Sequence, residues 1–148
     1  MRLAGARALI TGSTSGIGAA TAVMFGAEGA AVCVTGRDQG RGVEVVERVR
    51  AAGGTAEFIP ADLTDEAACT NLVDGAAEAL GGLTVLVNNA AGGGHDDGPV
   101  GAISTQAWHG ILRVNITAPF WLCRAAIPHL LEAGRGSIIN VSTRSEEH

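Results

Sequence analysis

The stretch Thr11-Gly12-Ser13-Thr14-Ser15-Gly16-Ile17-Gly18 decides the fold of this chain. It follows a short apolar run at residues 6–10 and precedes residues 19–28, an alanine-rich segment in which we predict a helix. Its glycines therefore lie where a strand turns into a helix. The first turn of a helix has unpaired backbone N–H groups and the positive end of the helix dipole, which attract anions. Because glycine has no side chain to keep an anion away, the stretch predicts a phosphate-binding turn.

The spacing of the glycines separates this turn from other nucleotide-binding loops. Gly12 suits the tight turn, Gly16 the close approach of a ligand, and Gly18 the packing of the helix on the strand. The pattern Gly-x-x-x-Gly-x-Gly is not the G-x-G-x-x-G fingerprint. A Walker-type loop needs a lysine, and all 10 basic residues of this chain are arginines. A glycine-rich loop without a ligand is the alternative, since short motifs also match by chance.

Composition indicates one soluble globular domain over residues 1–148. Apolar residues make up 47% of the chain and charged residues 17%, and a net charge of −5 without a basic cluster argues against a nucleic-acid partner. The three scattered cysteines suggest neither a metal site nor a disulfide framework, and we expect Cys33 in the core. Neither a membrane span nor room for a signal peptide is visible, so we expect a cytoplasmic protein with no membrane partner.

Strand and helix patterns alternate along the rest of the chain. Apolar runs predict strands at residues 30–35, 55–59, 83–87 and 137–141. Helices are predicted at residues 42–52, from a Thr64 cap to about Leu80, and from a Ser104 cap to about Glu132 with a bend near Pro119. This alternation predicts an α/β fold, a doubly wound parallel sheet of about five strands that is Rossmann-like. Ligands of such sheets bind at the carboxyl ends of the strands.

Further motifs stand at these strand ends and in the last helix. They are Asp62-Leu63-Thr64, Asn88-Asn89-Ala90-Ala91-Gly92, Val114-Asn115 with Trp108 upstream, and Ser137-Ile138-Ile139-Asn140-Val141-Ser142. With residues 11–18, and in this order, they make the chain from about Gly5 to Thr143 resemble the short-chain dehydrogenase/reductases. The resemblance implies an oxidoreductase that transfers hydride between a nicotinamide cofactor and a small carbonyl or alcohol substrate.

The resemblance also implies roles for individual residues. Those expected at the cofactor are Gly12, Ser13, Ser15, Gly16, Ile17, Gly18, Arg37, Asp62, Leu63, Asn89, Ala90 and Gly92. Those expected at the reaction are Asn115, whose family counterpart holds a water, and Thr143, which stands in place of a serine. The Asp62 carboxylate suits the adenine amino group, although an Asp ahead of a helix can be purely structural. Asn88 is expected to brace neighbouring strands.

The end of the second predicted strand bears on the choice of cofactor. A carboxylate there accepts hydrogen bonds from the ribose of NAD and repels the extra phosphate of NADP. This chain instead has Gly36 and then Arg37, whose guanidinium suits a phosphate, so we predict NADP(H). Asp38 follows one or two positions later, so binding of NAD(H) also remains possible. For Arg37, the alternative is a solvent-exposed side chain that binds no ligand.

The sequence departs from the family where the chemistry takes place. The family uses a tyrosine as general acid or base and a lysine four residues later, and this chain contains no tyrosine and no lysine. Family members run to roughly 250 residues, so we expect the cofactor-binding portion of a domain that is incomplete on its C-terminal side. A catalytic His95 is an alternative. The functions left open are an oxidoreductase, a non-catalytic nucleotide-binding module and a fragment without independent function.

The last strand and the last helix predict self-association. Residues 137–141 are apolar enough for an interior strand, and with little chain after them one side of the strand should lack a partner. The helix ahead of them should expose an apolar face that contains Trp121 or Leu122. We therefore expect a homo-oligomer, or aggregation if no ordered partner forms. A monomer whose last residues fold over the edge is the alternative.

Overall fold

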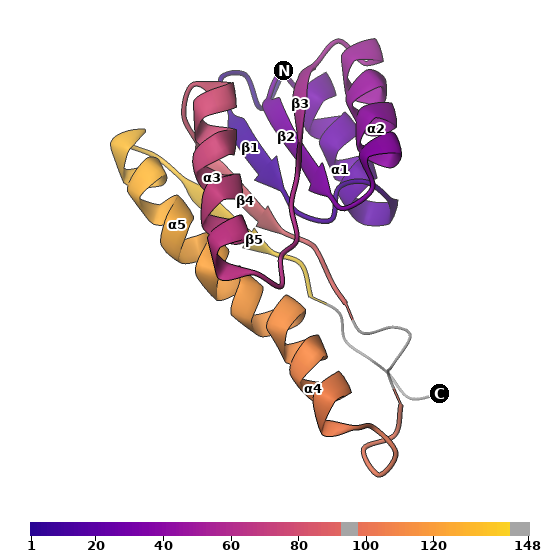
Figure 1. The fold of residues 1–148 in the computed structure, drawn as a ribbon. Coiled ribbons are helices and arrows are strands. Elements are labelled where there is room, and N and C mark those ends of the chain that lie inside the picture. Colours follow the sequence, from indigo (N-terminus) through magenta and orange to yellow (C-terminus); the bar gives the residue numbers. More distant parts are fainter. Residues whose placement is uncertain (93–97, 143–148) are drawn as a thin grey trace.

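A computed structural model describes residues 1–92 and 98–142, and their centre is a parallel five-stranded sheet (Figure 1). Its strands lie in the order β3-β2-β1-β4-β5. They are β1 (Arg7–Ile10), β2 (Ala31–Gly36), β3 (Thr55–Pro60), β4 (Val85–Asn88) and β5 (Ser137–Asn140). Every pairing between these strands is parallel. The predicted doubly wound α/β sheet is confirmed.

Helices cover both faces of the sheet, because successive side chains of a strand point to opposite faces. Along β1, Ala8 and Ile10 pack in one apolar cluster with α1 (Gly16–Ala27) and α2 (Gln39–Ala51). Leu9 points the other way, into a cluster with α3 (Glu66–Leu80) and α5 (Ala118–Glu132). The chain winds outward from β1 to β3 and then crosses back to β4, so the strand order reverses between β1 and β4. Cys33 is fully buried, as predicted.

Two helices begin at residues that the sequence did not indicate. α2 begins at Gln39 rather than Gly42, because the Asp38 carboxylate accepts a hydrogen bond from the Arg41 N–H at 3.0 Å. The prediction that Thr64 caps α3 is wrong. The cap is Asp65, whose carboxylate accepts from the Ala68 N–H at 2.8 Å. Ser104 does cap the next helix, α4 (Thr105–Leu112), by accepting from the Ala107 N–H at 3.1 Å.

The predicted long helix after Ser104 is interrupted. A π-helical segment, η1 (Arg113–Thr117), separates α4 from α5, and the Ala118 N–H donates to the carbonyl of Arg113, five residues earlier. Pro119 follows at the start of α5. Since proline has no N–H, it cannot donate to the Asn115 carbonyl as an α-helix would require. The irregularity expected near Pro119 therefore lies just before it, and π-helical turns are frequent at functional sites.

One edge of the sheet is uncovered among the described residues. β5 pairs with β4 alone, and Ile138, Ile139 and Val141 are 36%, 43% and 44% exposed. The prediction that α5 exposes Trp121 or Leu122 is wrong, because both pack against α3 and are 9% and 1% exposed. The exposed apolar side chains of η1 and α5 are instead Ile116, Phe120, Ile127 and Leu131. We call these four residues, with β5, the apolar edge.

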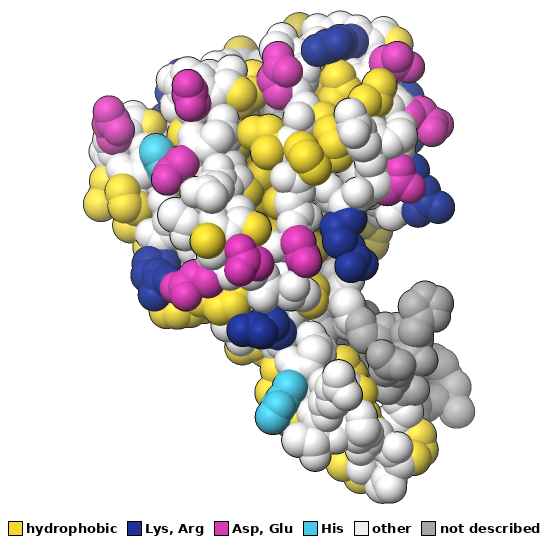
Figure 2. All heavy atoms as spheres, viewed as in Figure 1, with side chains coloured by type: hydrophobic (Ala, Val, Ile, Leu, Met, Phe, Trp, Pro, Cys, Tyr) yellow, Lys and Arg dark blue, Asp and Glu magenta, His cyan; other side chains and the backbone are white. Residues whose placement is uncertain are grey.

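The surface is otherwise mixed in character. Figure 2 shows acidic and basic side chains interspersed over one face, with apolar side chains between them. No helix within residues 1–92 and 98–142 combines the length and the apolar character that crossing a bilayer requires.

Candidate functional site

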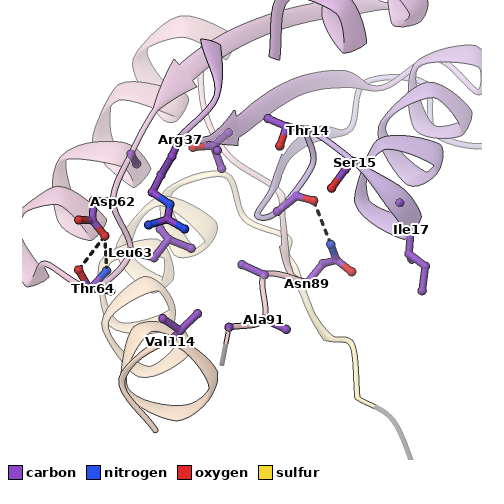
Figure 3. Close-up of a pocket in the computed structure, with 17 residues that line it drawn as sticks. Thr14, Ser15, Ile17, Arg37, Asp62, Leu63, Thr64, Asn89, Ala91 and Val114 are labelled. Atoms are coloured by element: carbon purple, nitrogen blue, oxygen red, sulfur yellow. Dashed lines mark hydrogen bonds between the residues drawn. The ribbon is translucent and has the colours of Figure 1, made fainter. Parts of the chain in front are cut away.

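A cavity of about 640 Å³ opens at the carboxyl ends of the strands (Figure 3). The turn from β1 to α1, the end of β2, the connection from β3 to α3 and the segment after β4 form its walls. Most of the residues predicted at the cofactor line it, namely Gly12, Ser15, Gly16, Ile17, Arg37, Asp62, Leu63, Asn89, Ala90 and Gly92. Ser13 and Gly18 are buried behind this wall. Thr14, Thr35 and Val114 also line the cavity, although none of them was predicted at the cofactor.

The N-terminus of α1 faces this cavity with its backbone uncovered. Gly12 and Gly16 have φ values of +62° and +53°, a conformation that favours glycine. A Cβ added at Gly16 would meet no atom within 4 Å. Ser15, the N-cap residue, makes no side-chain capping bond, and the first turn carries no acidic residue. Such an end fits a phosphate group, since its N–H groups and its partial positive charge remain available to an anion.

Gly18 lets α1 approach the turn closely. A Cβ at this position would collide with the carbonyl oxygen of Gly12 and lie 2.6 Å from Nδ2 of Asn89. The same Nδ2 donates hydrogen bonds to the carbonyls of Thr11 at 3.1 Å and Gly12 at 3.3 Å. The Asn89 side chain therefore ties the end of β4 to the glycine turn, which fits the predicted packing role of Gly18.

Thr11 also joins the end of β4 to the glycine turn, a role that its place in the motif did not predict. Its hydroxyl oxygen accepts from the backbone N–H groups of Asn89 and Ala90, both at 3.0 Å. Its own N–H donates to the Val87 carbonyl at 3.0 Å, and the residue is 1% exposed. The ends of β1 and β4 are thus joined where the strand order reverses, and Asn89 and Ala90 are held at the cavity wall.

Ser13 connects the same turn to β2. Its hydroxyl donates to the Ile10 carbonyl at 2.6 Å and accepts from the Thr35 N–H at 2.9 Å, and its N–H donates to the Thr35 carbonyl at 3.2 Å. The side chain is fully buried. Ser13 therefore positions the turn from behind. Thr35 lines the cavity, and its buried hydroxyl oxygen has no partner among the described residues.

Two charged side chains stand at the opposite wall. Arg37, at the end of β2, is exposed and reaches over the cavity towards Asp62 and Leu63 (Figure 3). The Asp62 carboxylate accepts from the Thr64 hydroxyl at 2.7 Å and from the Thr64 N–H at 3.0 Å. These hydrogen bonds lower the pKa of Asp62, and the positive charge of Arg37 lowers it further. Asp62 is therefore a carboxylate, and a hydrogen-bond acceptor, at neutral pH.

Asn115 lies beside the cavity and acts on its wall. Its side-chain oxygen accepts from the Gly92 N–H at 3.2 Å, and its Nδ2 donates to the Gly92 carbonyl at 3.1 Å. The π-helical segment thereby fixes the chain after β4, while the neighbouring Val114 lines the cavity itself. Thr143 and His95, the other residues considered for catalysis, lie outside the described residues.

Asn88 braces the sheet, as the sequence predicted. Its Nδ2 donates to the side-chain oxygen of Asn140 at 2.9 Å, across β4 and β5, and lies 3.5 Å from the Cys123 sulfur. The residue is 6% exposed and does not line the cavity.

Comparison with known proteins decides the family. Residues 6–147 match the family model described as short chain dehydrogenase. The chain belongs to this family. A 2,5-dichloro-2,5-cyclohexadiene-1,4-diol dehydrogenase from Sphingobium indicum is 47% identical over 96% of this chain. A 7α-hydroxysteroid dehydrogenase from Clostridium sardiniense is 37% identical over 96%. The alignments cover 56% and 55% of these two proteins, so this short-chain dehydrogenase spans about half the length of the curated relatives that it matches.

Solved structures share the fold. A metagenomic short-chain oxidoreductase in complex with NADP is 39% identical, with a TM-score of 0.90 over 98% of this chain and 65% of that one. A 7α-hydroxysteroid dehydrogenase in complex with NADH and 7-oxo glycochenodeoxycholic acid is 32% identical, with a TM-score of 0.91 over 96% and 55%. Short-chain dehydrogenases of this fold therefore include complexes with either nicotinamide dinucleotide.

Replacing Thr11 with valine, which has nearly the same shape, tests how much the Thr11 hydroxyl contributes to stability. Thr11→Val removes the acceptor of two backbone N–H groups, and each buried unpaired group costs about 1–3 kcal/mol. We expect the free energy of unfolding to fall by at least about 2 kcal/mol. Thr11→Ser keeps the oxygen and loses one methyl group, which costs about 1 kcal/mol. Urea unfolding of both variants measures this difference, and equal stabilities would contradict the role given to the hydroxyl.

Proposed function

We propose that this chain binds NADP(H) in the cavity as the cofactor-binding portion of an oxidoreductase acting on a small carbonyl or alcohol substrate. The observation that carries the proposal is the uncovered N-terminus of α1 at the glycine turn, opposite Arg37 in the same cavity. Three free cysteines accord with the reducing cytoplasm, where we place the protein.

The cavity offers a distinct group to each part of a dinucleotide. The first turn of α1, at Gly16 to Gly18, would hold the pyrophosphate. The Asp62 carboxylate, with Leu63 beside it, would accept from the adenine amino group. Asn89, Ala90 and Gly92 would face the nicotinamide ribose. The bound cofactor supplies hydride transfer, and the residues of this chain bind and orient it.

The preference for NADP(H) rests on the end of β2. Gly36 leaves the end of β2 without a carboxylate, and the Arg37 guanidinium suits the phosphate on the adenosine ribose. Asp38 does not line the cavity, and its carboxylate is engaged elsewhere, capping α2 through the Arg41 N–H and lying 3.7 Å from the Arg41 side chain. This arrangement favours a phosphate beside Arg37.

Reversing the charge of Arg37 tests this preference. Hydrogen bonds to charged groups contribute about 1.5–3 kcal/mol, so Arg37→Asp should weaken NADPH binding roughly tenfold or more and affect NADH much less. Fluorescence titration of both reduced cofactors measures the affinities. Arg48→Asp, on an exposed position of the last turn of α2, is the matched control and should leave both unchanged. Equal affinities in the parent that Arg37→Asp does not alter would refute the preference.

We further propose that this chain binds cofactor without turnover. It contains no tyrosine and no lysine, and general acid–base catalysis typically contributes about 10²–10⁴-fold. Among the residues expected at the reaction, Asn115 is bound to the backbone of Gly92, which makes it a positioning residue in this structure. A non-catalytic nucleotide-binding module is therefore the second candidate function.

Incubation with NADPH and a panel of ketones, quinones and aldehydes tests turnover. We expect saturable NADPH binding and no sustained oxidation of the cofactor, because the chain has neither the tyrosine nor the lysine that the family uses. A complete family member assayed in parallel is the positive control. Sustained oxidation that disappears in Thr143→Ala or His95→Ala would contradict the proposal and identify another proton donor.

We also propose that the protein self-associates through the apolar edge. Leu131 is 75% exposed there, and within residues 1–92 and 98–142 the β5 strand has a strand partner on one side only, which leaves its other side open to another chain. Leu131→Glu should shift the protein towards monomer. Met24→Glu, at a position 63% exposed on α1, should not. Light scattering at micromolar concentration measures the mass, and a parent protein that is already monomeric would contradict the proposal.

A further inference from the structure

The backbone conformation of Gly36, at the end of β2, does not require a glycine. A neighbouring side chain instead leaves no room for a Cβ at this position. Gly36 is absent from the glycines of the described chain that adopt a positive φ, so its conformation is open to other residues. A Cβ added there would lie 2.5 Å from Cγ2, 2.9 Å from Oγ1 and 3.3 Å from Cβ of Thr14. All three of the nearest atoms belong to this one side chain, so the closest obstacle to a side chain at position 36 is Thr14.

Thr14 has little freedom to give way. Threonine is branched at Cβ, which restricts its rotation about χ1, and its clashing atoms lie directly on that carbon. The neighbours of both residues are also bound together, because Ser13 and Thr35 exchange hydrogen bonds at 2.9 and 3.2 Å. The glycine turn and the end of β2 therefore cannot separate to make room without breaking buried hydrogen bonds.

The contact between Thr14 and position 36 lies at the end of β2, where the adenosine ribose of NAD or the extra phosphate of NADP would bind. Thr14, Gly36 and Arg37 line the same cavity, Thr14 from the turn and Arg37 from the chain just after β2 (Figure 3). A carboxylate at the end of this strand binds the ribose hydroxyls of NAD and repels the extra phosphate of NADP. Any such carboxylate at position 36 would need the space that Thr14 occupies.

We propose that Thr14 is a specificity-determining residue, which excludes a carboxylate from position 36 and so reserves the space beside Arg37 for a phosphate. This role rests on the proposed binding of a nicotinamide dinucleotide. It follows that the cofactor preference of this chain is set by a pair of positions on two different elements. Gly36→Asp alone should not give an NAD-type site, whereas Gly36→Asp together with Thr14→Ala should.

A double-mutant cycle tests the pair. Thermal unfolding midpoints, measured without cofactor, and dissociation constants for NADPH and NADH are determined for the parent, Thr14→Ala, Gly36→Asp and the double variant. We expect Gly36→Asp to lower the midpoint and weaken both cofactors, because the new side chain forces the glycine turn out of place. The double variant should recover most of the midpoint and shift the ratio of affinities towards NADH roughly tenfold or more relative to the parent. Thr14→Ala alone should keep the preference on the side of NADPH.

Two results would overturn the inference, and they are distinguishable from failure of the proposed function. Thr14 has no such role if Gly36→Asp is as stable as the parent and prefers NADH as strongly as the double variant. The same holds if the effects of the two substitutions on the midpoint simply add. A parent chain that binds neither dinucleotide would instead refute the proposed function, while the midpoints would still report the steric coupling of the two positions.

Discussion

The close contact of Gly18 with the Gly12 carbonyl sets the position of α1, and the cavity depends on that position. No side chain fits between them, and the Asn89 amide donates to the same carbonyl. The helix therefore begins directly against the end of β1, and its uncovered first turn faces the carboxyl ends of β2 and β4. Because a glycine in a helix costs about 1 kcal/mol relative to alanine, this approach has a cost in helix stability that close packing offsets.

Buried hydroxyl groups turn this contact into a rigid frame. Thr11 joins β1 to the segment after β4, and Ser13 joins the turn to β2. Both side chains are almost fully buried, where a hydrogen bond that is left unmade is costly. Around this frame the charges are arranged asymmetrically. The α1 terminus and Arg37 place positive charge at the cavity, whereas Asp62, whose pKa is lowered by hydrogen bonds from Thr64, places a carboxylate acceptor there.

Much of this arrangement could be predicted from the sequence, because backbone requirements leave clear signals. The glycine turn, the alternation of strands and helices, the Ser104 cap and the bracing role of Asn88 all follow from residue type and position. The wall residues Thr14 and Thr35 could not be predicted, since which side chains meet across two elements depends on their packing. The same holds for Thr11, whose hydroxyl accepts from two backbone N–H groups of the segment after β4.

Local competition explains the wrong predictions. Thr64 has the right type for a helix cap, but its hydroxyl donates to Asp62, and Asp65 caps α3 instead. In α5, the apolar residues Phe120, Trp121 and Leu122 are consecutive and point in different directions, so the sequence alone does not show which face is buried. Packing against α3 buries Trp121 and Leu122 and leaves Phe120 exposed. The π-helical segment ahead of Pro119 likewise depends on how the chain re-forms its hydrogen bonds around a missing donor.

Amide hydrogen exchange with and without NADPH tests the central claim most directly. If the dinucleotide binds along the strand ends with its pyrophosphate on α1, saturating NADPH should slow exchange in residues 12–18 and in the segments around Arg37 and Asp62. Exchange in α4 should not change, because that helix does not line the cavity. Protection that is absent from residues 12–18 at saturating NADPH, or that is confined to the apolar edge, would contradict the account.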